Sequence, residues 1–481
     1  MLFNSLEYLF FLPTVFLFYW FLFNKRLHYQ NLLILISSYV FYGWWDWKFL
    51  SLIILSTLVD YFMGLKISET QNKIHRNFYL WTSIVCNLSI LGFFKYYNFF
   101  IDSFIQLVNS FGYDITSIWT LNIILPVGIS FYTFQSMSYS LDIYYKKLHP
   151  TNNLITFAAF VSFFPQLVAG PIERASSLLP QLINKRKFDY VQAINGISLI
   201  SWGLFKKVVI ADNFSYFVDD IFLNYYDYGS LILIIGVFYF SFQIYCDFSG
   251  YSDIAIGTAK LLGFELTSNF LFPYFSRNIR EFWRRWHISL SSWFRDYVYK
   301  AIGGSRKGRW ISLRNIFVIF VISGFWHGAN FTFIIWGLIH ALLFIPTFLM
   351  GNNRKNSEYI ILHSKLVTLI NDVIKIGLTF TIVSIAWIFF RSENISSAFS
   401  YFSIILNNQY YISDIINYSN PLTEGRIIEP LFPFIIFLIY EFKFYFKKHQ
   451  FSLAETVFIW LSIIYFGNYF TNPTDFIYFQ F

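Results

Sequence analysis

The feature that most constrains this chain is a succession of apolar runs, each close to the roughly 20 residues that a helix needs to cross a bilayer. The runs lie near 6–23, 31–47, 49–65, 78–100, 118–141, 154–169, 190–211, 229–248, 312–329, 331–350, 373–390, 431–442 and 454–470. Only 13% of the residues are charged, against about 25% in a soluble domain. An integral membrane protein is the only class that fits, and we predict an all-α, multi-pass protein in a lipid bilayer.

No repeat and no Ser/Gly/Pro-rich linker divides the 481 residues. We therefore predict a single integral-membrane domain over 1–481. The opening stretch MLFNSLEYLFFLPTVFLFYWFLFN lacks a basic n-region and a small-residue cleavage site, which favours a retained first span over a signal peptide. Cys86 and Cys246 lie in apolar segments without metal-ligand spacing, so we expect two buried small side chains.

Lysines and arginines orient the spans, because they concentrate on cytoplasmic loops. They follow the first, third and fifth runs, for example at Lys25, Lys66 and Lys146, whereas the segment after the fourth run has none. This alternation places both termini outside, with 391–430 as an external loop and 471–481 as an extracytoplasmic tail. The net charge of +8 fits anionic lipid at the cytoplasmic face, and we expect no nucleic-acid partner.

The densest basic region, 277–314, holds ten lysines and arginines against two acidic residues, so we expect it at the cytoplasmic face. Within it, EFWRRWHISLSSWF predicts an amphipathic helix with aromatic residues on one face and arginines, together with His287, on the other. Such a helix lies either along the membrane surface or inside the protein beside a water-filled cavity. The adjacent Arg284 and Arg285 either contact anionic lipid or hold the phosphates of a nucleotide-like or pantetheine-type donor.

His327, in VISGFWHGANFTF, is a candidate for chemistry, because ionisable residues inside membrane segments are rare and usually face a bundle interior or a cavity. The flanking Gly324 and Gly328 permit a helix break or a close backbone approach. A histidine there suits a general base or a proton relay; the alternative is a histidine bonded to a backbone carbonyl. His287 is likewise a candidate general base or proton relay. The alternative for His287 is a polar residue on the interfacial face of the helix. No third ligand stands at a suitable spacing, so we expect no metal site.

Several long motifs follow one another along the chain. They are LPVGISFYTFQSMSYSLDIYY at 125–145, FPQLVAGPIER at 164–174, CDFSGYSDIAIGTAKLLGFEL at 246–266, NFLFPYFSRNI at 269–279, EFWRRWHISLSSWFRDYVY from 281 and SGFWHGANFTFIIWGLIHA from 323. Together they resemble the membrane-bound O-acyltransferase (MBOAT) family, most closely its bacterial alginate O-acetyltransferase (AlgI) group. The teichoic-acid D-alanylation protein DltB is a more distant likeness, and the resemblance is strongest over 120–340.

This resemblance implies the fold of the family, with roughly 11–13 transmembrane helices and further re-entrant or interfacial helices around a central tunnel. It implies that His327 is the catalytic base and that His287 lines the same tunnel as a second catalytic residue. Arg284 and Arg285 would hold the phosphate end of the donor. A neutral imidazole with an ordinary pKa near 6.5 suits general-base work at neutral pH.

The resemblance also implies the reaction, which is acetyl transfer across the membrane towards hydroxyls of an exopolysaccharide or cell-wall polymer. The donor would be cytoplasmic acetyl-CoA or a carrier-bound thioester, and we expect no bound cofactor. The implied partners are the polysaccharide acceptor and an extracytoplasmic SGNH-type acyltransferase, AlgJ- or AlgX-like. The implied location is the bacterial cytoplasmic (inner) membrane.

The chain ends with DFIYFQF. This F-x-Y-x-x-F ending resembles a C-terminal motif of the same family branch, in which the tyrosine carries the acyl group to an extracellular transferase. Tyr478 is therefore a candidate acyl relay. The alternative is an aromatic tail packed at the membrane interface.

Other interpretations stay open. D-alanyl or other acyl transfer to teichoic acid would use the same residues. A transporter or polysaccharide flippase would use the histidines as proton relays, but such proteins often show internal symmetry, and none is visible in the sequence. A non-catalytic scaffold gives no reason for a glycine-flanked His327.

Overall fold

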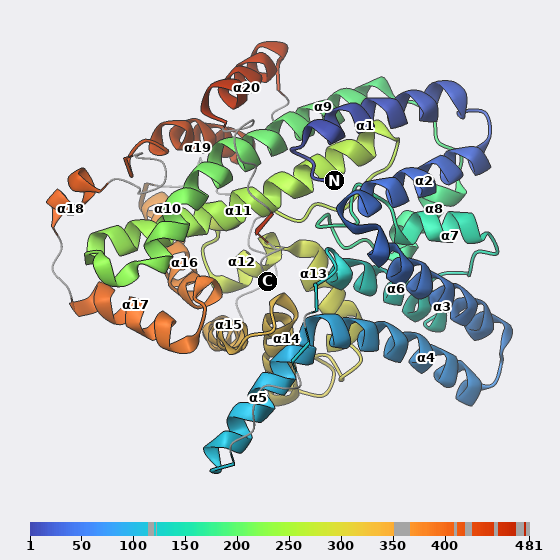
Figure 1. The fold of residues 1–481 in the computed structure, drawn as a ribbon, viewed down its shortest axis with the longest axis horizontal. Helices are drawn as coiled ribbons and strands as arrows, with labels where there is room; N and C mark the ends of the chain where they lie inside the picture. The colour runs from blue at the N-terminus through green and yellow to red at the C-terminus, as the bar shows by residue number, and fades with distance from the viewer. Residues whose placement is uncertain are drawn as a thin grey trace. The chain divides into compact units, whose positions relative to one another are not determined.

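The computed structural model describes residues 1–113, 120–121, 123–350, 366–407, 411–418, 426–446, 451–467 and 476–477 (Figure 1). Within these ranges the chain is helical and has no β-strand, which confirms the predicted class. The chain forms two compact units: Met1–Ile197 with Ala255–Thr267 is called unit 1, and Ser198–Ile254 with Ser268–Phe481 is called unit 2. A single domain over 1–481 stays a prediction.

Unit 1 is built around three helices that enclose a buried carboxylate. Asp60 of α3 accepts hydrogen bonds from Ser83 and from Asn87 of α4, the second at 2.9 Å, and from Ser140 of α6 at 3.2 Å. Because buried polar groups are stable only when bonded, this network fixes how three apolar helices pack. The helices of this unit are α1 (Leu6–Leu17), α2 (Leu27–Asp46), α3 (Leu50–Glu69), α4 (Lys73–Leu91), α5 (Tyr97–Ser110), α6 (Ile129–Tyr144), α7 (Leu154–Val161), α8 (Ala175–Ile183) and the start of α9 (Tyr190–Leu204).

The predicted span 154–169 is wrong. Its helix, α7, has only 8 residues and is followed by turns. Phe157, Phe160 and Phe163 are 0% exposed, so this run packs inside the protein. An apolar run of intermediate length suits a buried core helix as well as a span, and composition alone does not separate the two.

Unit 2 carries the basic region and both candidate histidines. Its helices are α10 (Asp212–Leu223), α11 (Ser230–Leu261, of which the last residues belong to unit 1), α12 (Ile279–Arg285), α13 (Ile288–Trp293), α14 (Arg309–His327), α15 (Phe331–Leu349), α16 (Leu366–Arg391), α17 (Ile395–Asn407), α18 (Ile412–Asn417), α19 (Leu431–Phe446) and α20 (Leu453–Phe466). A π-helical turn, Phe205–Ala211, joins α9 to α10.

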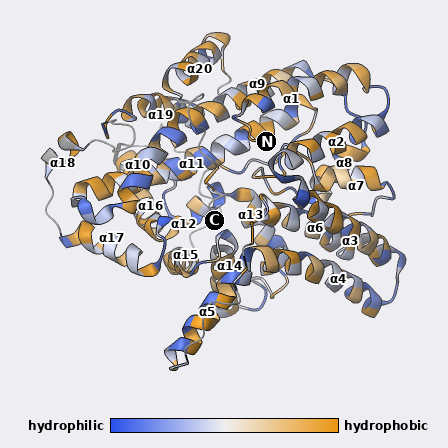
Figure 2. Ribbon diagram, in the orientation of Figure 1, coloured by the Kyte–Doolittle hydropathy of each residue, from blue (hydrophilic) through white to orange (hydrophobic). Residues whose placement is uncertain are grey.

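Seven helical runs among the described residues are long and apolar enough to cross a membrane: Leu27–Glu69, Lys73–Ser110, Tyr190–Leu223, Ser230–Leu261, Arg309–His327, Phe331–Leu349 and Leu369–Arg391. The first contains two of the predicted spans, which the turn Trp47–Phe49 separates. In Figure 2 apolar colour predominates along α3 and α4, and hydrophilic colour gathers in the turn between them. Phe62 and Trp81 on these helices are 53% and 59% exposed, as expected of surfaces that face lipid. A total of roughly 11–13 spans stays a prediction.

Candidate active site

His287 lies at a break between two short helices of unit 2. Its backbone is left-handed, with φ 43° and ψ 55°, a conformation that costs energy for any residue with a side chain. The break is held by Asn269, whose carbonyl accepts from the Ile288 N–H at 2.9 Å and whose side-chain oxygen accepts from the Ser289 hydroxyl at 2.6 Å. The single amphipathic helix predicted for this stretch is therefore wrong, because these bonds to a distant segment end α12 and start α13. The His287 side chain is 0% exposed.

His327 is the last residue of α14, where the sequence predicted a helix break. The two flanking glycines permit different close contacts. A Cβ on Gly324 would lie 2.2 Å from the carbonyl oxygen of Phe333, so this glycine allows α14 and α15 to approach closely. A Cβ on Gly328 would lie 2.1 Å from the Phe333 ring. The position directly after the histidine therefore has no room for a side chain beside this ring.

The structure brings the two histidines together. Their ring centroids are 6.4 Å apart, and Trp326 lies against both rings, 6.0 Å from His287 and 5.1 Å from His327. Aromatic rings complete the surroundings: Phe248 packs edge-on to His287 at 4.7 Å, and Trp336 packs edge-on to His327 at 5.1 Å. Two imidazoles in an aromatic enclosure form a small site that excludes bulk water.

Burial sets the protonation of the first histidine. Complete desolvation lowers the pKa of His287 to about 3, because an imidazolium loses its hydration in such a site. His287 is therefore neutral at physiological pH. A neutral imidazole presents one N–H donor and one nitrogen acceptor, so it can hold a carbonyl oxygen or share a proton.

The two adjacent arginines have different surroundings. Arg285 is 8% exposed and donates to Glu281 at 2.6 Å. Burial opposes the charged form of Glu281, but bonds from Arg277 and the charge of Arg285 keep its pKa below the usual range. Arg284 is exposed. Of the predicted donor-binding pair, only Arg284 is available to a phosphate without breaking an ion pair.

Three buried polar residues on α15 have no role predicted from the sequence. Thr332, Trp336 and His340 recur at every fourth position and are each 0% exposed. The Thr332 hydroxyl, the Trp336 indole nitrogen and Nε2 of His340 have no hydrogen-bond partner among the described residues. The spacing was visible in the sequence, but it is also the spacing of an ordinary packed helix face.

The described C-terminal residues dock on α11. Phe476 and Ile477 are 1% and 2% exposed, and they form the short red segment beside α11 in Figure 1. The Ile477 N–H donates to one carboxylate oxygen of Asp247 at 2.6 Å. The other oxygen is paired with Lys207 at 2.9 Å, so a buried ion pair anchors the segment at Ile477.

This anchor lies close to the histidines. The Phe476 ring packs against Phe248 at 5.7 Å and Tyr251 at 4.8 Å, and Phe248 is the ring that contacts His287. The candidate relay Tyr478 follows directly along the chain but lies outside the described residues.

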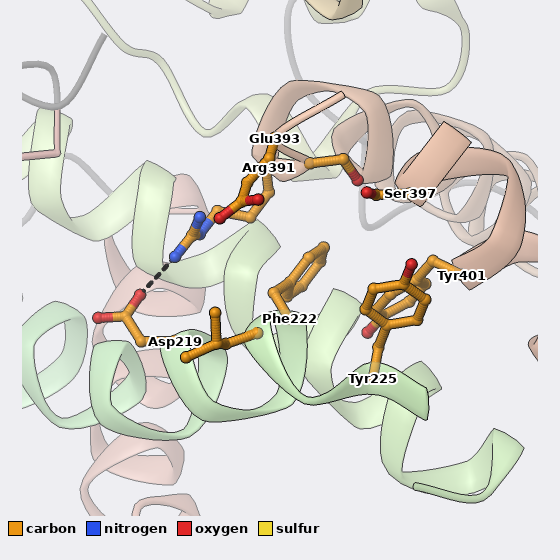
Figure 3. Close-up of a pocket in the computed structure, with 9 residues that line it drawn as sticks. Asp219, Phe222, Tyr225, Arg391, Glu393, Ser397 and Tyr401 are labelled. Atoms are coloured by element: carbon orange, nitrogen blue, oxygen red, sulfur yellow. Dashed lines mark hydrogen bonds and ion pairs between the residues drawn. The ribbon is translucent and has the colours of Figure 1, made fainter. Parts of the chain in front are cut away.

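A pocket of about 200 Å³ lies at the C-terminal end of α16 (Figure 3). Arg391 donates to Asp219 of α10 at 2.7 Å across its mouth. The pocket adjoins the His327 loop, because the Asn330 side chain donates to the Glu393 carbonyl at 2.7 Å. Phe390, next to Arg391, packs against the His327 ring at 5.5 Å. The lining residues are Asp219, Phe222, Leu223, Tyr225, Arg391, Ser392, Glu393, Ser397 and Tyr401.

Residues 145–385 match the model of the membrane-bound O-acyltransferase (MBOAT) family. The chain is 41% identical over 400 residues to the "Probable alginate O-acetylase AlgI" of Pseudomonas aeruginosa. The aligned residues cover 83% of this chain and 73% of that protein. It is 36% identical over 427 residues to the "Peptidoglycan O-acetyltransferase" of Helicobacter pylori, covering 83% and 78%. It is also 33% identical to the "Teichoic acid D-alanyltransferase" of Bacillus subtilis, covering 46% and 58%. The resemblance of the motifs is thereby confirmed.

Proposed function

The chain belongs to the membrane-bound O-acyltransferase family and is a multi-pass membrane O-acyltransferase, and we propose that it transfers acetyl groups across the membrane. The donor is a cytoplasmic thioester, acetyl-CoA or a carrier-bound acyl group. The acetyl group is passed towards hydroxyls of an exopolysaccharide or cell-wall polymer. The names of the alginate and peptidoglycan relatives support an acetyl group and a polymer acceptor.

The observation that carries the proposal is the pair of buried histidines whose rings lie 6.4 Å apart. His327 is the general base. It takes the proton of the attacking hydroxyl while the hydroxyl oxygen forms an ester bond to the acyl carbon. The carbon–sulfur bond then breaks, and the departing thiolate takes the proton from the imidazolium. The net result is an ester, a free thiol and an unchanged histidine.

His287 positions the thioester beside this base. Its neutral imidazole and full burial support a donor that holds a carbonyl oxygen without adding charge. Arg284 is the proposed contact for the phosphate end of the donor, because it is exposed and a guanidinium forms paired bonds to phosphate. Arg285 does not bind the donor in this proposal. Its ion pair with Glu281 stabilises α12.

The hydroxyl that takes the acetyl group from the thioester reaches the site from the other side of the membrane. We infer that both termini are outside and that the membrane is the bacterial cytoplasmic membrane. In this topology the pocket at Arg391 opens outside, next to the loop after His327. An extracytoplasmic SGNH-type transferase completes the transfer to the polymer.

Tyr478 is the proposed carrier between the two enzymes. Its hydroxyl takes the acyl group at His327 as an ester and passes it to the partner. The docking of the preceding residues supports this role, because Phe476 contacts the same phenylalanine as His287.

Surface ester content tests the proposal. A strain without the protein is complemented with the wild type, His327→Ala, His287→Ala or the control His75→Ala, whose histidine is exposed in unit 1. Alkali-labile acetate on the envelope polymer should return with the wild type and the control and be lost with His327→Ala at equal protein level. If acetate never depends on the protein, acetyl is the wrong group and D-alanine esters are measured next. Normal acetate in both site variants would refute the mechanism.

A further inference from the structure

A buried polar stripe on α15 consists of Thr332, Trp336 and His340. The three side chains lie one above another over about 12 Å of helix and are each 0% exposed. Buried polar groups in folded proteins are nearly always hydrogen-bonded, and each exception needs an explanation. Here three exceptions share one face of one helix, which indicates a common cause.

The stripe is rich in hydrogen-bond donors. Nδ1 of His340 accepts from the Trp283 indole at 3.4 Å. A neutral imidazole that accepts at one nitrogen carries its proton on the other, so Nε2 of His340 is a donor. The Trp336 indole is a donor only, and the Thr332 hydroxyl donates or accepts. A ligand that satisfies all three presents oxygen atoms rather than N–H groups.

The stripe runs from the donor end of the site to the catalytic base. His340 contacts Trp283 of α12, the helix that carries Arg284. Trp336 packs edge-on to the His327 ring at 5.1 Å and stacks on Trp387 at 5.5 Å. Thr332 lies in the first turn of α15, next to the loop after His327. A molecule along the stripe therefore brings its reactive end to the base.

We propose that this stripe binds the acyl donor, that His340 binds an oxygen of its arm, and that the Trp336 N–H binds the thioester carbonyl oxygen together with His287. The inference rests on the proposed acyl transfer. When the hydroxyl attacks, the carbonyl oxygen takes the electron pair of its double bond and becomes an oxyanion. The bond from Trp336 strengthens as that charge develops, and the charge returns to the carbonyl when the carbon–sulfur bond breaks. A fixed donor at such an oxygen accelerates acyl transfer by roughly 10²–10³-fold.

The test removes the N–H while an aromatic ring remains. Membrane vesicles with the cytoplasmic face outwards, containing wild type or Trp336→Phe, are supplied with radiolabelled acetyl-CoA. Initial rates of ester-linked label are then measured at several acetyl-CoA concentrations. For Trp336→Phe we expect kcat to fall about 100-fold or more with KM within threefold of the wild type. His340→Phe, which removes the Nε2 donor on the arm side of Trp336 while an aromatic ring remains, should raise KM several-fold.

Trp202→Phe is the matched control. Trp202 is also a buried tryptophan of unit 2, but its ring packs among Phe205, Phe437 and Tyr440 and not against either histidine. A loss of kcat in Trp202→Phe equal to that in Trp336→Phe would overturn the inference, as would a kcat of Trp336→Phe within threefold of the wild type. If wild-type vesicles incorporate no label, free acetyl-CoA is not the donor, and the same rates are measured with an acetyl group on a carrier protein. No label from either donor would overturn the proposed function, and the inference with it. His340→Phe keeps the inference testable if Trp336→Phe is not produced.

Discussion

The docking of the C-terminal segment makes a quantitative prediction for Phe476→Ala. Phe476 is 1% exposed and lies between Phe248 and Tyr251. Burial of a phenylalanine contributes about 2–3 kcal/mol, and loss of most of it shifts the docking equilibrium by on the order of 100-fold. Amide hydrogen exchange of the Ile477 N–H, read by mass spectrometry of the C-terminal peptide, should accelerate by that factor. Surface acylation should fall if the segment carries the acyl group.

The control separates docking from folding. Phe399→Ala removes a phenylalanine that is 55% exposed, and it should change neither exchange nor acylation. If exchange at Ile477 accelerates in Phe476→Ala while acylation stays normal, the docked segment is not part of the reaction and the relay role of Tyr478 is wrong. If exchange is unchanged, the burial of Phe476 does not hold the segment and the argument from packing fails.

Three further sets of changes test other parts of the structure. Lys207→Met leaves the buried carboxylates of Asp212 and Asp247 without their cation. The free energy of unfolding, measured by denaturation of the detergent-purified protein, should therefore fall by about 3–5 kcal/mol. Gly324→Ala places a Cβ 2.2 Å from a carbonyl of α15 and should lower the melting temperature, whereas Gly377→Ala meets open space and should raise it by removing about 1 kcal/mol of helix cost. In a chain without its native cysteines, Ser396→Cys should react with an impermeant maleimide outside whole cells and Lys307→Cys only after permeabilisation. The reverse labelling would contradict the topology.

The membrane class and the helical fold were predictable because both follow from run length and charge content. Helix limits were less predictable where apolar residues pack against protein instead of lipid. The run 154–169 has the composition of a span, yet it contains a helix of only 8 residues. Conversely, α11 extends to Leu261, well past the predicted limit of 248, because buried polar residues are tolerated where other helices surround them.

The site was predictable in its residues but not in its geometry. His327 and its two glycines indicated a helix end, and α14 does end there. Periodicity placed His287 on the polar face of one continuous helix, whereas bonds to Asn269 break that helix and bury the ring. Such bonds join segments distant in sequence, so no local pattern reports them. For the same reason the sequence alone does not distinguish Trp336 from an ordinary packing residue.

An ion pair holds α16 near each of its two ends. Near its start Asp372 pairs with Arg277 of the basic region, and at its end Arg391 pairs with Asp219. Asp372 and Arg391 are 19 positions apart, which corresponds to about 28 Å of helix, close to the roughly 30 Å of a bilayer core. His327 contacts Phe390 and therefore lies near the end of α16 that is far from Arg277. Arg284 is closer to the base, because it precedes His287 by three residues and the His287 ring lies 6.4 Å from the His327 ring. A donor whose phosphates are held by Arg284 therefore has to cross only part of the bilayer to bring its thioester to the base, and the α15 stripe, about 12 Å long, follows that part of the path.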